Sequence, residues 1–370
     1  MPAALPDFGS CRRVLIIKPS SLGDIVHTLP TVHLLKESYP HLEFTWVINP
    51  VFASLVEGNA DLAGTAFFPR DQFRGLGGLW RFSRWLNHIP PRLKPDIALD
   101  FQGLLRSGLT AHASRAPLRA GFSDSREGAR FFHTHIIPVN PDAHAIDRSL
   151  TLPRAFGLAG PACFPLPQGS CPAAFFSGNA AYSGTPPAPR VTGAETLSLP
   201  PAPILLHPFS RGKRKSLTPP QTLLLCQALS PLPVILVGRS ELTFSDPLPT
   251  NTRNLLNQTT LHELIWLIRR ARGVISVDSG PMHIAAALTP HVLSLHAWSD
   301  PRKVGPWHAG TSVYKAGKLM QTGHLDPAFC SLSSDIPDSA IPQIAAWAFQ
   351  TPSAPETREV LPGSRPFGDS

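Results

Sequence analysis

The chain has 370 residues, 42% of them hydrophobic and 16% charged, which is too apolar for a disordered protein and long enough for two ordinary domains. Lys and Arg outnumber Asp and Glu by 33 to 25, giving a formal net charge of +8 that favours anionic partners; without a basic stripe carrying interleaved aromatics, nucleic acid is not expected. No run approaches the ~20 apolar residues of a transmembrane helix, and residues 1–10 lack a secretion pattern. The five cysteines form no CxxC pair, so we expect a cytoplasmic protein with at most peripheral membrane contact.

The first part of the chain alternates between strand and helix patterns. Short apolar runs predict strands, and longer periodic segments predict a helix from Ile25 to Glu37 and another through Leu105 and Ala113. The predicted strands are 14–17, 44–48, 97–100 and 136–139. Strands alternating with helices predict a doubly wound parallel sheet.

Between residues 157 and 203 the composition shifts to Pro, Gly, Ala and Ser, and the periodicity ends, which predicts a linker or an insertion. The alternation then restarts, with strands predicted at 204–206, 234–237, 274–277 and 292–295 and helices at 223–229, 261–270 and 282–288. Five segments are therefore expected: an extension (1–11), a domain (12–156), a linker or insertion (157–203), a second domain (204–350) and a flexible tail (351–370).

The loop KPSSLGDIVHTLP follows the first predicted strand, where ligands of such sheets bind. Its small residues Ser20, Ser21 and Gly23 allow the backbone to turn tightly and approach a ligand. Asp24 stands where the helix begins and has two interpretations: an N-cap of that helix, or a general base that deprotonates an acceptor hydroxyl. The loop is not the GxGxxG fingerprint, which disfavours a classical dinucleotide-dependent oxidoreductase.

The segment ISVDSGPMHIAAAL is the strongest local signal. A buried strand ends at Val277, a turn of Asp278, Ser279 and Gly280 follows, and a helix starts at Pro281, so free amides and the helix dipole make an anion site. We expect Ser279 to donate to a diphosphate and Asp278 to accept from a ribose hydroxyl or a nearby donor. His283, one turn into the helix, is interpreted either as a site residue or as an ordinary packed histidine.

The segment LLHPFSRGKRKSLTP follows the first strand of the second predicted domain. It concentrates four cations: Arg211, Lys213, Arg214 and Lys215. They are interpreted either as a solvated basic loop or as cations that neutralise a leaving diphosphate.

Together these three segments, with TTLHELIWLIRRARG and DPRKVGP, resemble glycosyltransferase family 9, the ADP-heptose:lipopolysaccharide heptosyltransferase family. The resemblance covers most of 12–150 and 204–310. It implies an α/β fold of the GT-B type, with two Rossmann-like parallel-sheet domains facing a central cleft. Residues 12–156 would be the acceptor side and 204–350 the nucleotide-sugar-binding side.

The resemblance also implies roles for single residues. Asp24 is the expected base and Lys215 the phosphate-neutralising lysine. The expected nucleotide-sugar-binding residues are Ser21, Gly23, Ser210, Arg211, Glu241, Thr259, Asp278, Ser279, Gly280 and His283. No metal or cofactor is expected, and the chain has no Asp-x-Asp motif. The family's lysine motif continues with Trp-Pro, where this chain has Leu217 and Thr218.

The expected function is therefore inverting, metal-independent transfer of a sugar, heptose from ADP-heptose, onto a lipopolysaccharide core or related acidic glycolipid. The partners would be the nucleotide-diphosphate sugar and that acceptor, at the cytoplasmic face of the inner membrane. Arg70, Arg74, Arg106 and Arg119 are candidates for receiving the acceptor. Two alternatives stay open: a nucleotide-sugar-binding protein without transfer, and a GT-B-shaped sugar-nucleotide epimerase.

Overall fold

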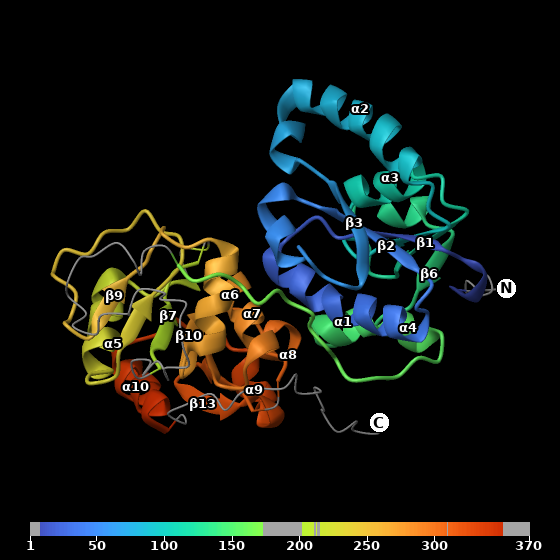
Figure 1. Cartoon of the computed structure of the whole chain (residues 1–370). Helices are drawn as coiled ribbons and strands as arrows, with labels where there is room; N and C mark the ends of the chain where they lie inside the picture. Colours follow the sequence, from blue (N-terminus) through green and yellow to red (C-terminus); the bar gives the residue numbers. More distant parts are fainter. Residues whose placement is uncertain (1–7, 173–201, 211, 213–214, 309, 351–370) are drawn as a thin grey trace, which may run out of the picture. The chain divides into compact units, whose positions relative to one another are not determined.

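The structure, a computed structural model, describes residues 8–172, 202–210, 212, 215–308 and 310–350. Its internal contacts divide the chain into two units, with the boundary between Pro167 and Gln168 (Figure 1). Each unit has its own sheet, covering helices and hydrophobic core.

The first unit contains a six-stranded, wholly parallel sheet in the order β3-β2-β1-β4-β5-β6. Its strands are β1 (Arg13–Ile17), β2 (Glu43–Ile48), β3 (Leu62–Phe67), β4 (Ile97–Asp100), β5 (Leu118–Phe122) and β6 (His135–Ile137). Its α-helices are α1 (Leu22–Ser38), α2 (Gly75–Leu93), α3 (Leu105–Ala113) and α4 (Ala145–Ala155), with 3-10 helices η1 (Phe8–Ser10), η2 (Pro50–Leu55), η3 (Arg70–Phe73) and η4 (Ala129–Phe132).

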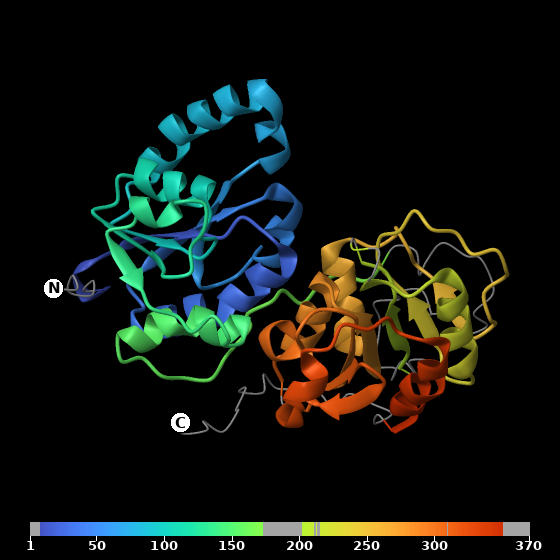
Figure 2. The ribbon, with the colours of Figure 1, turned by 180° about the vertical axis from the view of Figure 1, so that it is seen from behind.

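Helices cover both faces of this sheet. α1 packs beside α4 on one face, and α2 packs beside α3 on the other (Figures 1 and 2). β1 and β4 are buried along almost their whole length because helices cover them on both sides. The cluster under α2 includes Leu15, Val47, Phe68, Phe73 and Phe82. This packing fixes the ends of β1 and β4, where the site of this unit lies.

The second unit contains a seven-stranded sheet in the order β13-β12-β11-β10-β7-β8-β9, parallel except for the antiparallel pair β12–β13. Its strands are β7 (Ile204–His207), β8 (Val234–Leu236), β9 (Thr252–Asn254), β10 (Gly273–Val277), β11 (Val292–His296), β12 (Ser312–Lys315) and β13 (Lys318–Gln321). Its helices are α5 (Pro219–Ala228), α6 (Leu261–Arg270), α7 (Gly280–Leu288), α8 (Pro301–Val304), α9 (Pro327–Cys330) and α10 (Ile341–Gln350), with 3-10 helices η7 (Thr322–His324) and η8 (Asp338–Ala340).

The two sheets share one topology. Counted along the chain within each unit, six strands of both sheets run in the order 3-2-1-4-5-6, and β13 is an addition to the second. In such a sheet the chain changes direction between strands 1 and 4, and ligands bind beyond the carboxyl ends at that switch point. The switch points are β1/β4 in the first unit and β7/β10 in the second.

The predicted α/β class with two Rossmann-like parallel-sheet domains is confirmed. Each predicted strand and helix is present, with ends shifted by a few residues. The sequence patterns missed β3, α2, β5, α4, β9, the β12–β13 pair and α10. The five-segment division stays a prediction, since most of 157–203 and all of 351–370 lie outside the described residues.

The structure adds two facts, one about the cysteines and one about membrane-spanning helices. All five cysteines lie in the described part of the chain, and none forms a disulfide. Across the described residues, no helix combines the length and apolarity that crossing a bilayer would need.

Candidate functional site

The site of the first unit begins with Lys18, the residue directly after β1. Its side chain is buried, and Nζ donates to the carbonyl oxygen of Phe101 at 2.9 Å, just past the end of β4. The indole of Trp46 on β2 donates to the Lys18 carbonyl at 3.0 Å. Burial lowers the pKa of Lys18 below its ordinary value, an effect partly offset by the charges of Asp24 and Asp100. Lys18 therefore links the two strand ends at the switch point.

Asp24 lies at the third position of α1, and the N-cap is Ser21, so the interpretation of Asp24 as the N-cap is wrong by one turn. Its Oδ2 accepts from the backbone amide of Ser21 at 2.8 Å and from the Ser21 hydroxyl at 2.7 Å. Oδ1 lies 3.8 Å from Nζ of Lys18. The carboxylate thus holds the helix start with one oxygen and faces a cation with the other.

Asp24 and Lys18 line a small open pocket of about 80 Å³ in the first unit. α1 contributes His27 and Thr28, α4 contributes Ala145, Arg148 and Ser149, and the ends of β4 and β5 contribute Phe101 and Phe122. Arg148 forms an ion pair with Asp124. The pocket therefore combines one carboxylate with two cations, an arrangement suited to a polar, negatively charged ligand.

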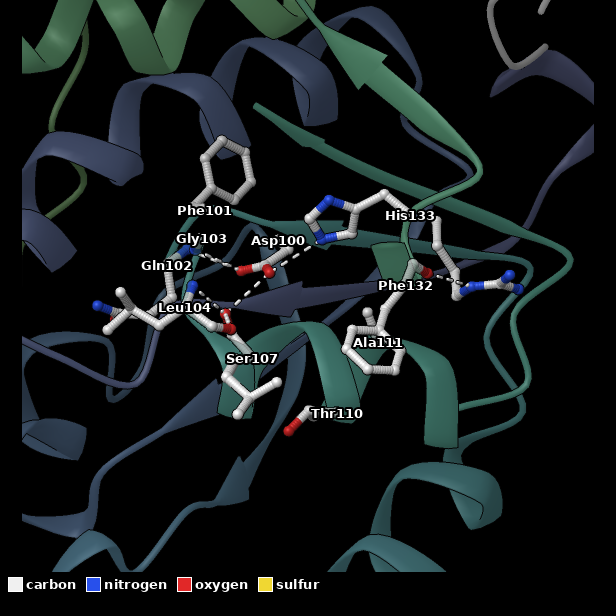
Figure 3. Close-up of polar contacts among 12 residues, drawn as sticks. Asp100, Phe101, Gln102, Gly103, Leu104, Ser107, Thr110, Ala111, Phe132 and His133 are labelled. Atoms are coloured by element: carbon white, nitrogen blue, oxygen red, sulfur yellow. Dashed lines mark hydrogen bonds and ion pairs between the residues drawn. The ribbon is translucent and has the colours of Figure 1, made fainter. Parts of the chain in front are cut away.

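Behind this pocket, Asp100 at the end of β4 organises a buried network (Figure 3). Its Oδ1 accepts from the amides of Gln102 and Gly103 at 2.9 and 3.0 Å. Its Oδ2 accepts from the Ser107 hydroxyl at 2.8 Å and contacts Nε2 of His133 at 3.1 Å. The side chains of Asp100 and His133 are both fully buried. The network fixes the backbone after β4, including the Phe101 carbonyl that accepts from Lys18.

The site of the second unit centres on a close ion pair between Lys215 and Asp278. Lys215, in the loop after β7, donates from Nζ to Oδ2 of Asp278, directly after β10, at 2.5 Å. The same ammonium lies 4.4 Å from the ring centroid of Trp298, a cation–π contact. The sequence placed Lys215 and Asp278 in one site and expected Asp278 to accept from a nearby donor; Lys215 is that donor.

The surroundings keep Asp278 ionised. Burial by itself would raise the Asp278 pKa, but hydrogen bonds from Lys215 and Ser299 and the charge of Lys215 lower it on balance. Burial also lowers the pKa of His296 to about 4, so the imidazole is neutral at pH 7 and Lys215 supplies the positive charge. Lys315 is fully buried and donates to the carbonyls of Ala297 and Ser299 at 2.6 and 3.0 Å, which fixes the loop carrying Trp298.

The turn before α7 lies where the sequence places it, between β10 and α7. Ser279 is the N-cap of α7, and its side chain makes no capping hydrogen bond to the helix. Instead, its Oγ lies 3.2 Å from Nδ1 of His207, at the end of β7. The hydroxyl is therefore turned toward β7, at the start of α7. His283 is half-buried on the first turn of the same helix.

The other predicted residues lie on loops at the carboxyl edge of the second sheet. Ser210 bonds within its loop, its amide donating to Oγ of Ser216 at 2.8 Å. Glu241 is exposed in the loop after β8, and Thr259 is half-buried just before Thr260, the N-cap of α6. Arg211 lies outside the described residues. Ser21 and Gly23 lie at the start of α1 in the first unit.

The departure from Trp-Pro at 217–218 has a local explanation. Leu217 is almost fully buried in the core of the second unit. Thr218 is the N-cap of α5 and forms a capping box with Gln221. After Lys215, Leu217 therefore supplies a buried apolar side chain, and Thr218 caps the start of α5.

The four arginines suggested for the acceptor have different surroundings. Arg70 reaches Ser20 Oγ at 3.4 Å, while Arg74 pairs with Asp71. Arg106 donates to the Phe73 carbonyl, and Arg119 donates to the carbonyls of Phe132 and Ala116, so both support the fold. Sequence reasoning did not single out Lys18 or Trp298. Lys18 could have been found, because it follows a strand directly.

Within the part of the chain that the structure describes, no group of three or more His, Cys, Asp or Glu side chains is arranged to hold a metal ion. Metal independence stays a prediction.

Two α/β units of one topology, each with polar groups at its switch point, define a two-domain fold of the GT-B type. Solved structures share it. A glycosyl transferase family 9 structure from Veillonella parvula superposes with a TM-score of 0.66 at 17% identity, over 92% of this chain and 97% of that one. The E. coli heptosyltransferase WaaC with ADP-2-deoxy-2-fluoro heptose superposes with a TM-score of 0.58 at 20% identity, over 82% and 93%.

Sequence comparison finds similarity to one family over part of the chain. Residues 242–322 match glycosyltransferase family 9 (heptosyltransferase). Lipopolysaccharide heptosyltransferase 1 of Pseudomonas aeruginosa is 33% identical over 165 residues, which cover 42% of this chain and 44% of that protein. The lipopolysaccharide core heptosyltransferase OpsX of Haemophilus influenzae is 21% identical over 84% of this chain and 87% of its own length. The first of these matches spans under half of the relative. Over these parts of its length, the chain is similar to glycosyltransferase family 9.

Proposed function

We propose that this protein is an inverting, metal-independent heptosyltransferase that moves heptose from ADP-heptose onto a lipopolysaccharide core or related acidic glycolipid in the cytoplasm. The observation that carries the proposal is that charged groups lie at both switch points of a chain similar to glycosyltransferase family 9. Asp24 and Lys18 lie at one, and Lys215 and Asp278 lie at the other. Relatives with lipopolysaccharide heptosyltransferase names support the substrate class.

In the proposed reaction, Asp24 takes the proton of the acceptor hydroxyl as its oxygen attacks the anomeric carbon. The bond from that carbon to the diphosphate oxygen breaks on the opposite face, so the configuration inverts and ADP leaves. Lys215 and the amides at the start of α7 neutralise the charge that develops on the diphosphate. Lys18, held by the Phe101 carbonyl, stabilises the ionised form of Asp24.

The direct test incubates the full chain with ADP-heptose and a delipidated, heptose-free core acceptor. We expect an acceptor product heavier by one heptose, with inverted anomeric configuration by NMR, and formed equally in EDTA. Consumption of the donor without acceptor would instead indicate an epimerase. Donor binding without any product would indicate a binding protein.

Asp24→Asn tests the base. The amide oxygen can still accept from the Ser21 amide, so the helix start is preserved, but the side chain can no longer take a proton. Loss of general-base catalysis typically costs about 10²–10⁴-fold, and we expect kcat to fall by that order while ADP affinity, measured by calorimetry, is retained. Asp71→Asn, at an exposed carboxylate of the same unit, is the matched control. Near-normal turnover of Asp24→Asn would remove Asp24 as the base.

A further inference from the structure

α2 has two apolar faces, and the fold buries only one of them. Phe82 and Gly78 are buried, and Trp85, Leu86 and Ile89 pack against the same core. Toward the N-terminal end, however, Leu76 is 89%, Leu79 59% and Trp80 65% exposed. These three residues have the i, i+3, i+4 spacing of one helix face, so they form a continuous apolar crest in solvent.

The charged residues from Arg74 to Lys94 are all basic, and the carboxylate just before them, Asp71, pairs with Arg74. From Gln72 to Pro95 the sequence contains no Asp or Glu, while it contains Arg74, Arg81, Arg84, Arg92 and Lys94. All five of these cations are exposed. The guanidinium of Arg84 lies 5.6 Å from the centroid of the Trp80 ring, so a cation accompanies the largest apolar group. The crest therefore consists of exposed apolar side chains with exposed arginines beside them.

An exposed Leu and Trp ridge beside arginines is the pattern of a helix that lies in the interface of a membrane. There the apolar side chains enter the acyl boundary, the Trp sits at headgroup depth, and each nearby Arg is attracted to the anionic headgroups. A neutral or cationic protein partner would not be attracted electrostatically to these arginines. We infer that the N-terminal half of α2 docks the protein onto an anionic phospholipid bilayer.

The inference goes beyond the proposed function, because it uses a helix face far along the chain from Asp24 and needs neither donor nor acceptor. A protein that docked through α2 would act on an acceptor already anchored in the same bilayer. Figures 1 and 2 show α2 on the face of its sheet opposite α1 and α4. The lipid-binding residues and the pocket residues therefore lie on different elements, and variants can separate them.

The test is co-sedimentation of the full chain with vesicles of phosphatidylcholine alone or mixed with equimolar phosphatidylglycerol. We expect binding to the mixed vesicles that weakens as salt is raised, and little binding to phosphatidylcholine.

Leu76→Gln/Leu79→Gln should weaken binding roughly tenfold or more, because two leucines no longer enter the acyl boundary. Arg81→Glu/Arg84→Glu should abolish the preference for anionic lipid. Leu224→Gln, on the exposed face of α5, should bind as the unaltered chain does.

Each contrary outcome is distinct. Equal vesicle binding by Leu76→Gln/Leu79→Gln and Leu224→Gln would overturn the inference, as would binding that ignores lipid charge. A dimer in light scattering that the Leu76/Leu79 variant converts to a monomer, without vesicle binding, would assign the crest to a second copy. The same variant should keep full transfer to the delipidated acceptor, so failure of docking and failure of the proposed function are separable.

Discussion

Two buried histidines of the second unit, His207 and His296, are tied to the candidate site by short hydrogen bonds. Nδ1 of His207 lies 3.2 Å from the Ser279 hydroxyl, and Nδ1 of His296 lies 2.9 Å from Ser299. Burial lowers the pKa of each to about 4. Both imidazoles are therefore neutral at pH 7.

This predicts acid sensitivity at moderate pH. In the unfolded chain a histidine takes up a proton near pH 6.5, while in the folded protein it does so only near pH 4, so stability falls as the pH drops through that window. Each histidine should remove about 2 kcal/mol of unfolding free energy between pH 7 and pH 5. Urea unfolding at both pH values measures the difference, and His207→Gln or His296→Gln should reduce it.

The exposed His324 supplies the control, because His324→Gln removes a histidine without touching the two buried ones. A loss of stability that is the same in all three variants would contradict the assignment of this sensitivity to the two buried histidines.

At the scale of single elements, short packed strands rely on small residues. Gly121 on β5 lies against the imidazole of His133, and a Cβ at this position would overlap the ring. The glycine thus leaves room for the histidine that contacts Asp100. Gly64 on β3 is a matched position, because a Cβ there meets nothing within 4 Å.

Gly121→Ala should therefore lower stability by about 2 kcal/mol, the usual cost of overpacking, while Gly64→Ala should change it little. Thermal unfolding of the two variants in parallel makes the comparison. Equal melting temperatures would show that His133 can move aside, and that the Asp100 network is less rigid than its burial indicates.

The elements that the sequence patterns missed have identifiable causes. β3 is an edge strand with small and polar residues, so it lacks a continuous apolar run. α2 starts with three glycines in four residues and contains Pro90 and Pro91, both of which lower helix propensity. Packing of Phe82 and Trp85 against the core stabilises this helix in spite of its composition.

At the scale of the whole molecule, two units with separate cores predict separate responses to ligand. We expect ADP to bind the second unit, where the start of α7 and Lys215 provide the anion site. A ligand at a hundredfold excess over Kd stabilises the unit that binds it by about 2.7 kcal/mol.

Hydrogen exchange with and without ADP tests this expectation. Protection should increase around Lys215 and over 278–283 and stay unchanged around Asp24, with GDP and UDP as controls for the base. Protection confined to the first unit would contradict the assignment of the nucleotide side.

The sequence by itself determined the α/β class, the strand ends to examine, and the candidate residues Asp24, Lys215 and Asp278, because hydrophobic periodicity and loop composition are local signals. Tertiary structure alone decided which of them meet. Lys215 and Asp278 are 63 positions apart and form an ion pair only because β7 and β10 are neighbours in the sheet. Lys18 reaches Phe101, and Asp100 reaches His133, for the same reason: strand order brings distant loops to one edge, and no local pattern encodes that order.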